Sequence, residues 1–164
     1  MLVAVLFSQG VPCITQDSIE DAEFARFVGI ATRVRQRNID LLQPMAFDSP
    51  RDIKWHGAGP GSEPDWEGAA PYGTPGVNVM GFSVRHEEGR GIFVAFNPHV
   101  TASAVGLPDV LPGTMWAKVI DTSREAPDDA LIREVEPVIG ASIAMGPQSA
   151  LVLELVPATP PPEV

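Results

Sequence analysis

Two kinds of hydrophobic periodicity divide this sequence at about Pro44. Between residues 18 and 42, apolar residues recur at three- and four-residue spacing, and charged residues occupy much of the remaining surface. Ser18 followed three residues later by Asp21 is typical of a capping box, and Pro44 cannot continue a helix. The pattern therefore predicts a helix from about residue 18 to residue 42.

After Pro44 the period changes to two, which is typical of half-buried strands. The polar, glycine-containing segment 86–91 lies between two such runs and predicts a β-hairpin. Because no helical pattern separates the runs, they indicate an antiparallel β-sandwich instead of βαβ units. We expect strands at 51–56, 77–85, 92–96, 115–121 and 149–156, with a weaker strand within 138–145.

Composition limits the class of protein and its partners. A length of 164 residues suits one domain with a small annex, and 45% hydrophobic residues indicate a folded chain. The formal net charge of -10 would repel phosphate backbones and anionic lipids, so we expect no nucleic-acid partner. No stretch approaches the roughly 20 apolar residues of a membrane span, and the apolar start Met1 to Phe7 lacks the flanks of a signal peptide.

Residue spacing alone identifies no active site and no cofactor. The lone Cys13 excludes an intramolecular disulfide and a cysteine-based zinc site, which favours an intracellular protein with an inert, buried thiol. His56, His86 and His99 are not paired at ligand spacing, so surface or capping histidines are expected instead of metal ligands. The adjacent acids at 87–88 and 128–129 are expected in solvated loops.

The segment between His56 and Val77 is rich in glycine and proline and indicates a long loop, of which we expect residues 56–61 to be flexible. The loop also contains Trp66 and Tyr72. Large aromatic residues in a loop usually anchor it by packing on the core, and the alternative is that they stack on a sugar. The sequence leaves both interpretations open.

Six short motifs occur in order along the chain, namely Ser8–Pro12, Arg33–Arg35, Asp52–Gly57, Asp65-Trp66, Phe93–Asn97 and Asp121-Thr122. In their order and spacing they resemble isoamylase-type debranching enzymes, which are α-amylase superfamily glycoside hydrolases, with the plant and green-algal members most similar. The resemblance covers residues 6 to 156 and implies three parts. Residues 1–45 would be the last strand and helix of a catalytic (β/α)8 barrel, 46–157 a C-terminal antiparallel β-sandwich, and 158–164 a disordered tail, so the expected fold class is mainly β.

This sequence also departs from the family pattern. The family's catalytic carboxylates lie on barrel strands before the Gly10–Pro12 step, so the chain would begin after them. Where family members continue into a Gly-Asp-Glu segment, this chain has Ile14–Asp17. Retaining cleavage needs two carboxyl groups about 5 to 5.5 Å apart. We therefore expect the chain alone to be inert, with no catalytic, substrate-binding or metal residues, although the whole enzyme would hydrolyse α-1,6-glucosidic branch points.

The resemblance further implies partners and a location. The partners would be an α-glucan (starch, amylopectin or glycogen), bound through the full enzyme, and isoamylase subunits. The location would be the plastid stroma in a plant or alga and otherwise the cytoplasm. Phe24, Phe27 and Val28 would face missing barrel elements and be partly exposed. The alternative function is a non-catalytic glucan-binding or regulatory module that uses Trp55, Trp66 or Tyr72.

Overall fold

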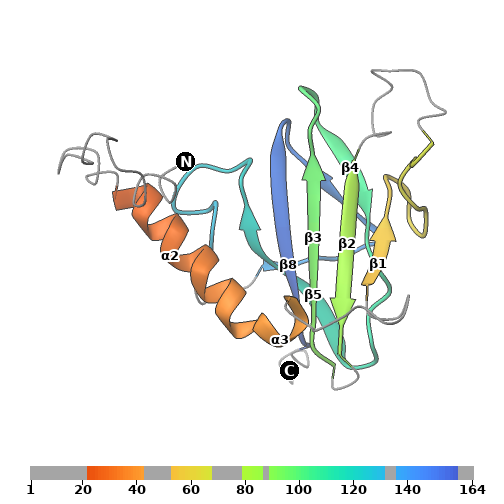
Figure 1. The fold of residues 1–164 in the computed structure, drawn as a ribbon, viewed down its shortest axis with the longest axis horizontal. Coiled ribbons are helices and arrows are strands. Elements are labelled where there is room, and N and C mark those ends of the chain that lie inside the picture. Colours follow the sequence, from red (N-terminus) through yellow and green to blue (C-terminus); the bar gives the residue numbers. More distant parts are fainter. Residues whose placement is uncertain (1–21, 43–52, 68–78, 87–88, 132–135, 159–164) are drawn as a thin grey trace, which may run out of the picture.

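The computed structural model describes residues 22–42, 53–67, 79–86, 89–131 and 136–158, and every element below lies within these ranges. Antiparallel pairing joins six strands in the order β1-β2-β3-β8-β5-β6 and two more, β4 and β7, in a second sheet. The expectation of a mainly β fold with antiparallel sheets is thus confirmed (Figure 1). The elements are α2 (Ala22–Arg37), α3 (Ile39–Leu42), β1 (Ile53–His56), β2 (Met80–Arg85), β3 (Gly91–Asn97), β4 (Ser103–Gly106), β5 (Thr114–Asp121), β6 (Glu136–Pro137), β7 (Ser142–Met145) and β8 (Ser149–Pro157).

The strong periodic runs all form strands, namely β1, β2, β3, β5 and β8. The predicted hairpin is confirmed, because β2 and β3 pair from Met80 opposite Phe96 to Arg85 opposite Gly91. The weaker strand within 138–145 begins only at Ser142, as β7. No periodic pattern predicts β4, whose small residues form a strand by pairing with β7.

The predicted helix is interrupted at Asn38, which corrects the single helix expected from 18 to 42. The Asn38 side-chain amide donates a hydrogen bond to the Val34 carbonyl at 2.9 Å and another to Glu154 on β8. This buried contact with the sheet fixes the break, and periodicity within the helix cannot report it. Residues 18–21 lie outside the described ranges.

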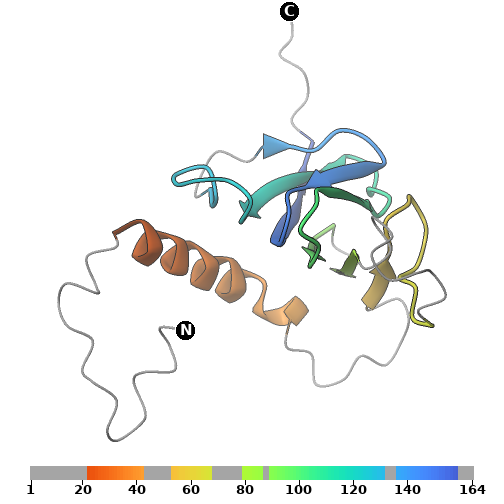
Figure 2. The ribbon, with the colours of Figure 1, turned by 90° about the horizontal axis from the view of Figure 1, so that it is seen from above.

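The six-stranded sheet has a hydrophobic core on each face. One face packs against the β4-β7 sheet through a core that includes Phe93, Trp116 and Leu153. The opposite face packs against α2 and α3 through Ile30 and Val34. Figure 2 shows the helix running along this second face. Because each face of the sheet contacts a core, β3 and β8 carry apolar residues at most positions, and their side chains are buried or half-buried at most of them.

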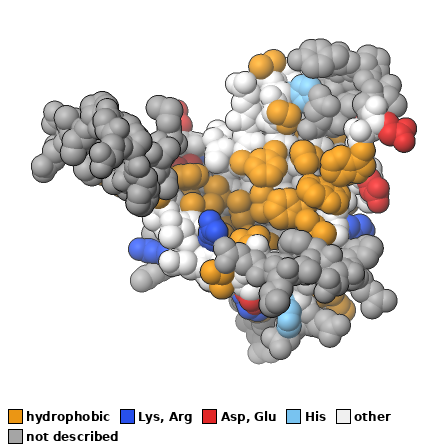
Figure 3. Space-filling model, in the orientation of Figure 1, with side chains coloured by type: hydrophobic (Ala, Val, Ile, Leu, Met, Phe, Trp, Pro, Cys, Tyr) orange, Lys and Arg blue, Asp and Glu red, His pale blue; other side chains and the backbone are white. Residues whose placement is uncertain are grey.

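Helix α2 covers only part of its face of the sheet. Figure 3 shows hydrophobic side chains gathered beside the helix on the face that carries it. Phe96 on β3 is 44% exposed, and Trp55 and Phe82 are half-buried. On the helix itself, Phe24 is 40% exposed, and Phe27 and Val28 are half-buried. The expected partial exposure of these three helix residues is found, while Phe27 packs against the helix-sheet core.

The glycine-rich loop after β1 is closely packed over residues 57–62, which corrects the expected flexible loop there. The Gly57 amide donates to the Ser62 carbonyl at 2.8 Å, and the Gly106 amide of β4 donates to the Gly57 carbonyl at 3.0 Å. A Cβ added at Gly106 would lie 2.2 Å from the Gly59 carbonyl oxygen. These glycines therefore permit close backbone approach, a role that composition does not distinguish from flexibility.

Two further expectations concern the ends of the chain. The strand expected from a barrel remnant falls within residues 1–21, which the structure does not describe. At the other end, the Ala158 amide donates to the Gly113 carbonyl at 2.9 Å, and residues 159–164 lie outside the described ranges. Neither described helix is long and apolar enough to cross a membrane.

Candidate functional site

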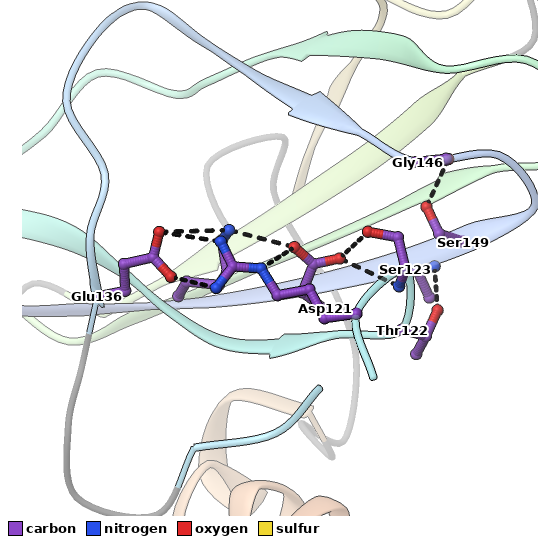
Figure 4. A network of polar contacts seen from close by, with 9 residues as sticks. Asp121, Thr122, Ser123, Glu136, Gly146 and Ser149 are labelled. Atoms are coloured by element: carbon purple, nitrogen blue, oxygen red, sulfur yellow. Dashed lines mark hydrogen bonds and ion pairs between the residues drawn. The ribbon is translucent and has the colours of Figure 1, made fainter. Parts of the chain in front are cut away.

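A polar network centred on Asp121 lies where β5 ends (Figure 4). The Lys118 ammonium is 3.1 Å from the Asp121 carboxylate and 3.6 Å from that of Glu136 on β6. Arg124 completes the network with two hydrogen bonds to Glu136, at 2.8 and 3.2 Å. Two cations and two carboxylates thus neutralise one another at the edge of the large sheet.

Burial and hydrogen bonding act in opposite directions on Asp121. Burial by itself raises the pKa of the carboxyl group, but the Ser123 hydroxyl at 2.6 Å and the Lys118 ammonium lower it by more. The net pKa lies below the ordinary value of an aspartate. A general acid for glycoside cleavage needs a shift in the other direction. Asp121 is therefore suited to anchoring its neighbours and not to donating a proton.

The turn that follows Asp121 is tied to the start of β8. The Thr122 amide donates to the Ala150 carbonyl at 3.0 Å, and the Ala150 amide donates to the Thr122 hydroxyl at 2.8 Å. Ser149 donates its hydroxyl to the Gly146 carbonyl at 2.7 Å. A Cβ added at Gly146 would lie 2.4 Å from the Ser123 Cβ, so glycine is required for this approach.

A groove of about 550 Å³ lies over this network. Its polar part consists of the Asp121 network, and its apolar part includes Val138, Ile143 and Met145. The volume is in the range of small-molecule pockets. However, the charged groups already satisfy one another within the protein, and no cluster of three or more histidine, cysteine or acidic residues suited to a metal is found in the described ranges.

Comparisons with known proteins identify the family to which the β domain is similar. Residues 54–150 match the family described as Isoamylase 1-3, C-terminal. The chain belongs to this family. Isoamylase 1, chloroplastic, from Oryza sativa subsp. japonica is 32% identical over 112 residues, and Isoamylase SU1, chloroplastic, from Zea mays is 33% identical over 112 residues. Each alignment covers 68% of this chain and 13% of the relative, so the chain spans a small part of the length of these relatives.

His56 is the deeply buried histidine of this isoamylase C-terminal sequence. His56 is 2% exposed, and its Nε2 lies 2.9 Å from the Ser83 hydroxyl, which corrects the expected surface or capping position. Burial, reinforced by the charges of Lys54 and Arg85, lowers the pKa of His56 to about 4. The ring is therefore neutral at physiological pH and packs edge-on against Phe93.

The other two histidines are near the surface. His86 is exposed, at the end of the β2 strand, and His99 is half-buried in the turn after β3. The Nε2 atom of His99 is buried and has no hydrogen-bond partner among the described residues. The structure brings none of the histidines together.

The loop tryptophan of this family member packs on β1. The Trp66 and Trp55 rings meet edge to face with their centroids 5.3 Å apart, and Trp55 in turn contacts Phe82. Trp66 is nevertheless 59% exposed. The expected anchoring of the loop is thus found together with a surface that remains open. Tyr72 lies outside the described ranges, as do Cys13 and the acids at 87–88.

Asp129 was expected in a solvated loop, and the structure corrects this. Its carboxylate pairs with Arg26 of α2, and the same arginine donates to the Ala130 carbonyl at 2.9 Å. The Asp121 network was also missed as a site, although Asp121-Thr122 is one of the family-like motifs. The sequence feature that could have indicated this network is Lys118, because a charged residue within a largely apolar strand needs a partner when it is buried.

Proposed function

We propose that this chain is the C-terminal β-sandwich part of a starch or glycogen debranching glycoside hydrolase. The hydrolysis of α-1,6-glucosidic branch points would be carried out with catalytic carboxylates contributed by polypeptide outside these 164 residues. The observation that carries the proposal is the match of residues 54–150 to the Isoamylase 1-3, C-terminal family. The domain division is part of the proposal, with residues 1–45 as the end of a catalytic barrel and 46–157 as the sandwich.

The contacts of α2 support a structural role for the sandwich. Three ion pairs join the helical segment to the β domain, formed by Arg26, Arg37 and Asp40 with Asp129, Glu154 and Arg90. Together with the apolar core beneath the helix, they hold the helical segment on the sheet. In the proposed enzyme, the sandwich would therefore hold the last helix of the barrel in place by packing against the outer side of that helix.

The test has two measurements. The purified 164-residue chain is incubated with amylopectin, and released linear chains are measured against a full-length plant isoamylase as positive control. We expect release by the control alone. An antibody to residues 50–156 should detect a native band several times heavier than 17.5 kDa. Debranching by the purified chain would overturn the assignment of catalysis to other polypeptide.

Location and partners follow from the same proposal. Several relatives carry chloroplastic in their names, so we expect the native protein in the plastid. The expected substrate is an α-glucan, and the expected protein partners are isoamylase subunits. Fractionation of plastids with the same antibody checks the location, and recovery outside plastids would contradict it.

The second candidate is a non-catalytic glucan-binding or regulatory module. The 59% exposure of Trp66 favours it, since an open indole surface can stack on a sugar ring. A Trp66→Ala variant with unaltered retention on immobilised glucan would remove this support. A native band at 17.5 kDa would favour the module over the fragment.

A further inference from the structure

A second groove, of about 450 Å³, is lined by residues at the end of β3 and the start of β8. These two strands pair side by side in the large sheet (Figure 1). Phe96 lines it from β3 with a side chain that is 44% exposed. The strand neighbour of Phe96 on β8 is Ala150, whose small side chain leaves the ring open on that side. An exposed aromatic ring thus lines a shallow groove that is open to solvent.

Gln148 lines the same groove in an unusual backbone conformation. Its φ of 45° is in the left-handed region, which favours glycine and disfavours residues with a side chain by roughly 1 to 2 kcal/mol. Among the described residues, Gln148 is the one non-glycine residue with positive φ. A side chain in a backbone conformation that glycine adopts more easily points to a function for that side chain.

Two polar groups of this groove, on Gln148 and Thr122, remain available to a ligand. In the described ranges, the Gln148 side-chain amide has no hydrogen-bond partner within the protein. The Thr122 hydroxyl accepts from the Ala150 amide, which leaves its proton free to donate. Among the residues that the structure describes, no charged side chain lines the groove. This distinguishes it from the Asp121 groove, whose charged groups are paired with one another.

The frame around the groove is rigidly bonded. Asn97, which is 1% exposed, donates to the carbonyls of Thr101 at 2.9 Å and Gly146 at 2.7 Å. The Gln148 amide nitrogen of the backbone donates to the His99 carbonyl at 2.7 Å. These bonds hold the two turns together, so the amide and the aromatic ring are presented without a large ordering cost on binding.

We propose that the groove between Phe96 and Gln148 binds a glucosyl unit of an α-glucan. The apolar C–H face of the pyranose would pack on the Phe96 ring, and the Gln148 amide and Thr122 hydroxyl would bond its hydroxyl groups. An uncharged groove with an aromatic wall suits a neutral, polyhydroxylated ligand. The choice of an α-glucan rests on the proposed function, whereas the groove is independent of where catalysis occurs.

The experiment measures maltoheptaose binding to the full 164-residue chain by titration calorimetry, with cellohexaose as the β-1,4-linked comparison. Gln148→Gly is the decisive variant, because glycine relieves the backbone strain while removing the amide. We expect its melting temperature to be unchanged or higher and its affinity to fall roughly three- to tenfold. Phe96→Leu, which keeps apolar volume but removes the ring, should lower affinity about tenfold.

Matched controls are Gln36→Ala, an exposed glutamine on α2, and Trp66→Ala, an exposed aromatic residue outside the groove. Both should retain maltoheptaose affinity. Absence of binding by the unaltered chain, equal affinity for cellohexaose, or loss of affinity in Trp66→Ala alone would overturn the proposal. None of these results would alter the debranching assay or the native mass, which test the proposed function separately.

Discussion

Arg37 on α2 and Glu154 on β8 form a two-bond fork, with Nε to Oε1 at 2.7 Å and Nη2 to Oε2 at 2.6 Å. Asn38 donates to the same carboxylate. Glu154 lies on the helix-facing side of its strand, opposite the buried Ile92, and is only 12% exposed. One carboxylate therefore connects the end of the helix to the centre of the sheet.

Replacing this carboxylate should loosen the helix. We expect Glu154→Gln to lower the free energy of unfolding by about 1 to 2 kcal/mol, because a charge-assisted hydrogen bond in a poorly hydrated position is lost. Urea denaturation followed by circular dichroism measures it. The control is Asp40→Asn, which removes an exposed pair with Arg90 and should cost less. Equal losses in the two variants would contradict the special position of Glu154.

Acid should destabilise the domain through His56. The folded pKa of about 4 lies below the unfolded value of 6.5, so the unfolded state binds more protons between these values. Stability is fully present above pH 6.5 and is lost as the pH falls, by about 3 kcal/mol at pH 4. The free energy of unfolding should fall over this range for the unaltered chain and fall less for His56→Gln, because glutamine does not titrate. If the two curves of unfolding free energy against pH had the same slope, folding would not lower the pKa of His56.

Two glycine substitutions should have opposite effects. Gly106→Ala places a Cβ 2.2 Å from the Gly59 carbonyl oxygen, and we expect it to destabilise the fold by about 1 to 3 kcal/mol. Gly29→Ala, within α2, meets nothing within 4 Å and should stabilise by about 0.5 to 1 kcal/mol through helix propensity. Thermal melts of the two variants check both signs. A neutral Gly106→Ala would mean that the loop moves away from β4 at little cost.

The Asp121 network should be asymmetric in its energetics. Asp121→Asn leaves the buried Lys118 ammonium with a weaker partner, and we expect a loss of about 3 kcal/mol. Glu136→Gln removes a carboxylate that is 43% exposed and should cost at most about 1 kcal/mol. Chemical denaturation of both variants, with the Lys118→Met and Asp121→Asn pair as a double-mutant cycle, measures the coupling. A coupling near zero would refute the role assigned to Lys118.

Local patterns in the sequence determined much of the fold. Alternation over β2 and largely apolar runs over β3 and β8 specified strands, and the polar segment after His86 specified the hairpin between β2 and β3. The order of short motifs likewise identified the family that residues 54–150 match. These features depend on residues close to one another in the chain, so the sequence alone reports them.

Only the tertiary structure decided which residues meet from distant segments. The break at Asn38, the burial of His56 beside Ser83 and the strand β4 all depend on partners far along the chain. The groove between Phe96 and Gln148 is a further case, since neither residue carries a motif and the backbone of Gln148 has its unusual φ only within the assembled turn. Periodicity encodes which face of an element is buried, but the partner on that face is set by packing.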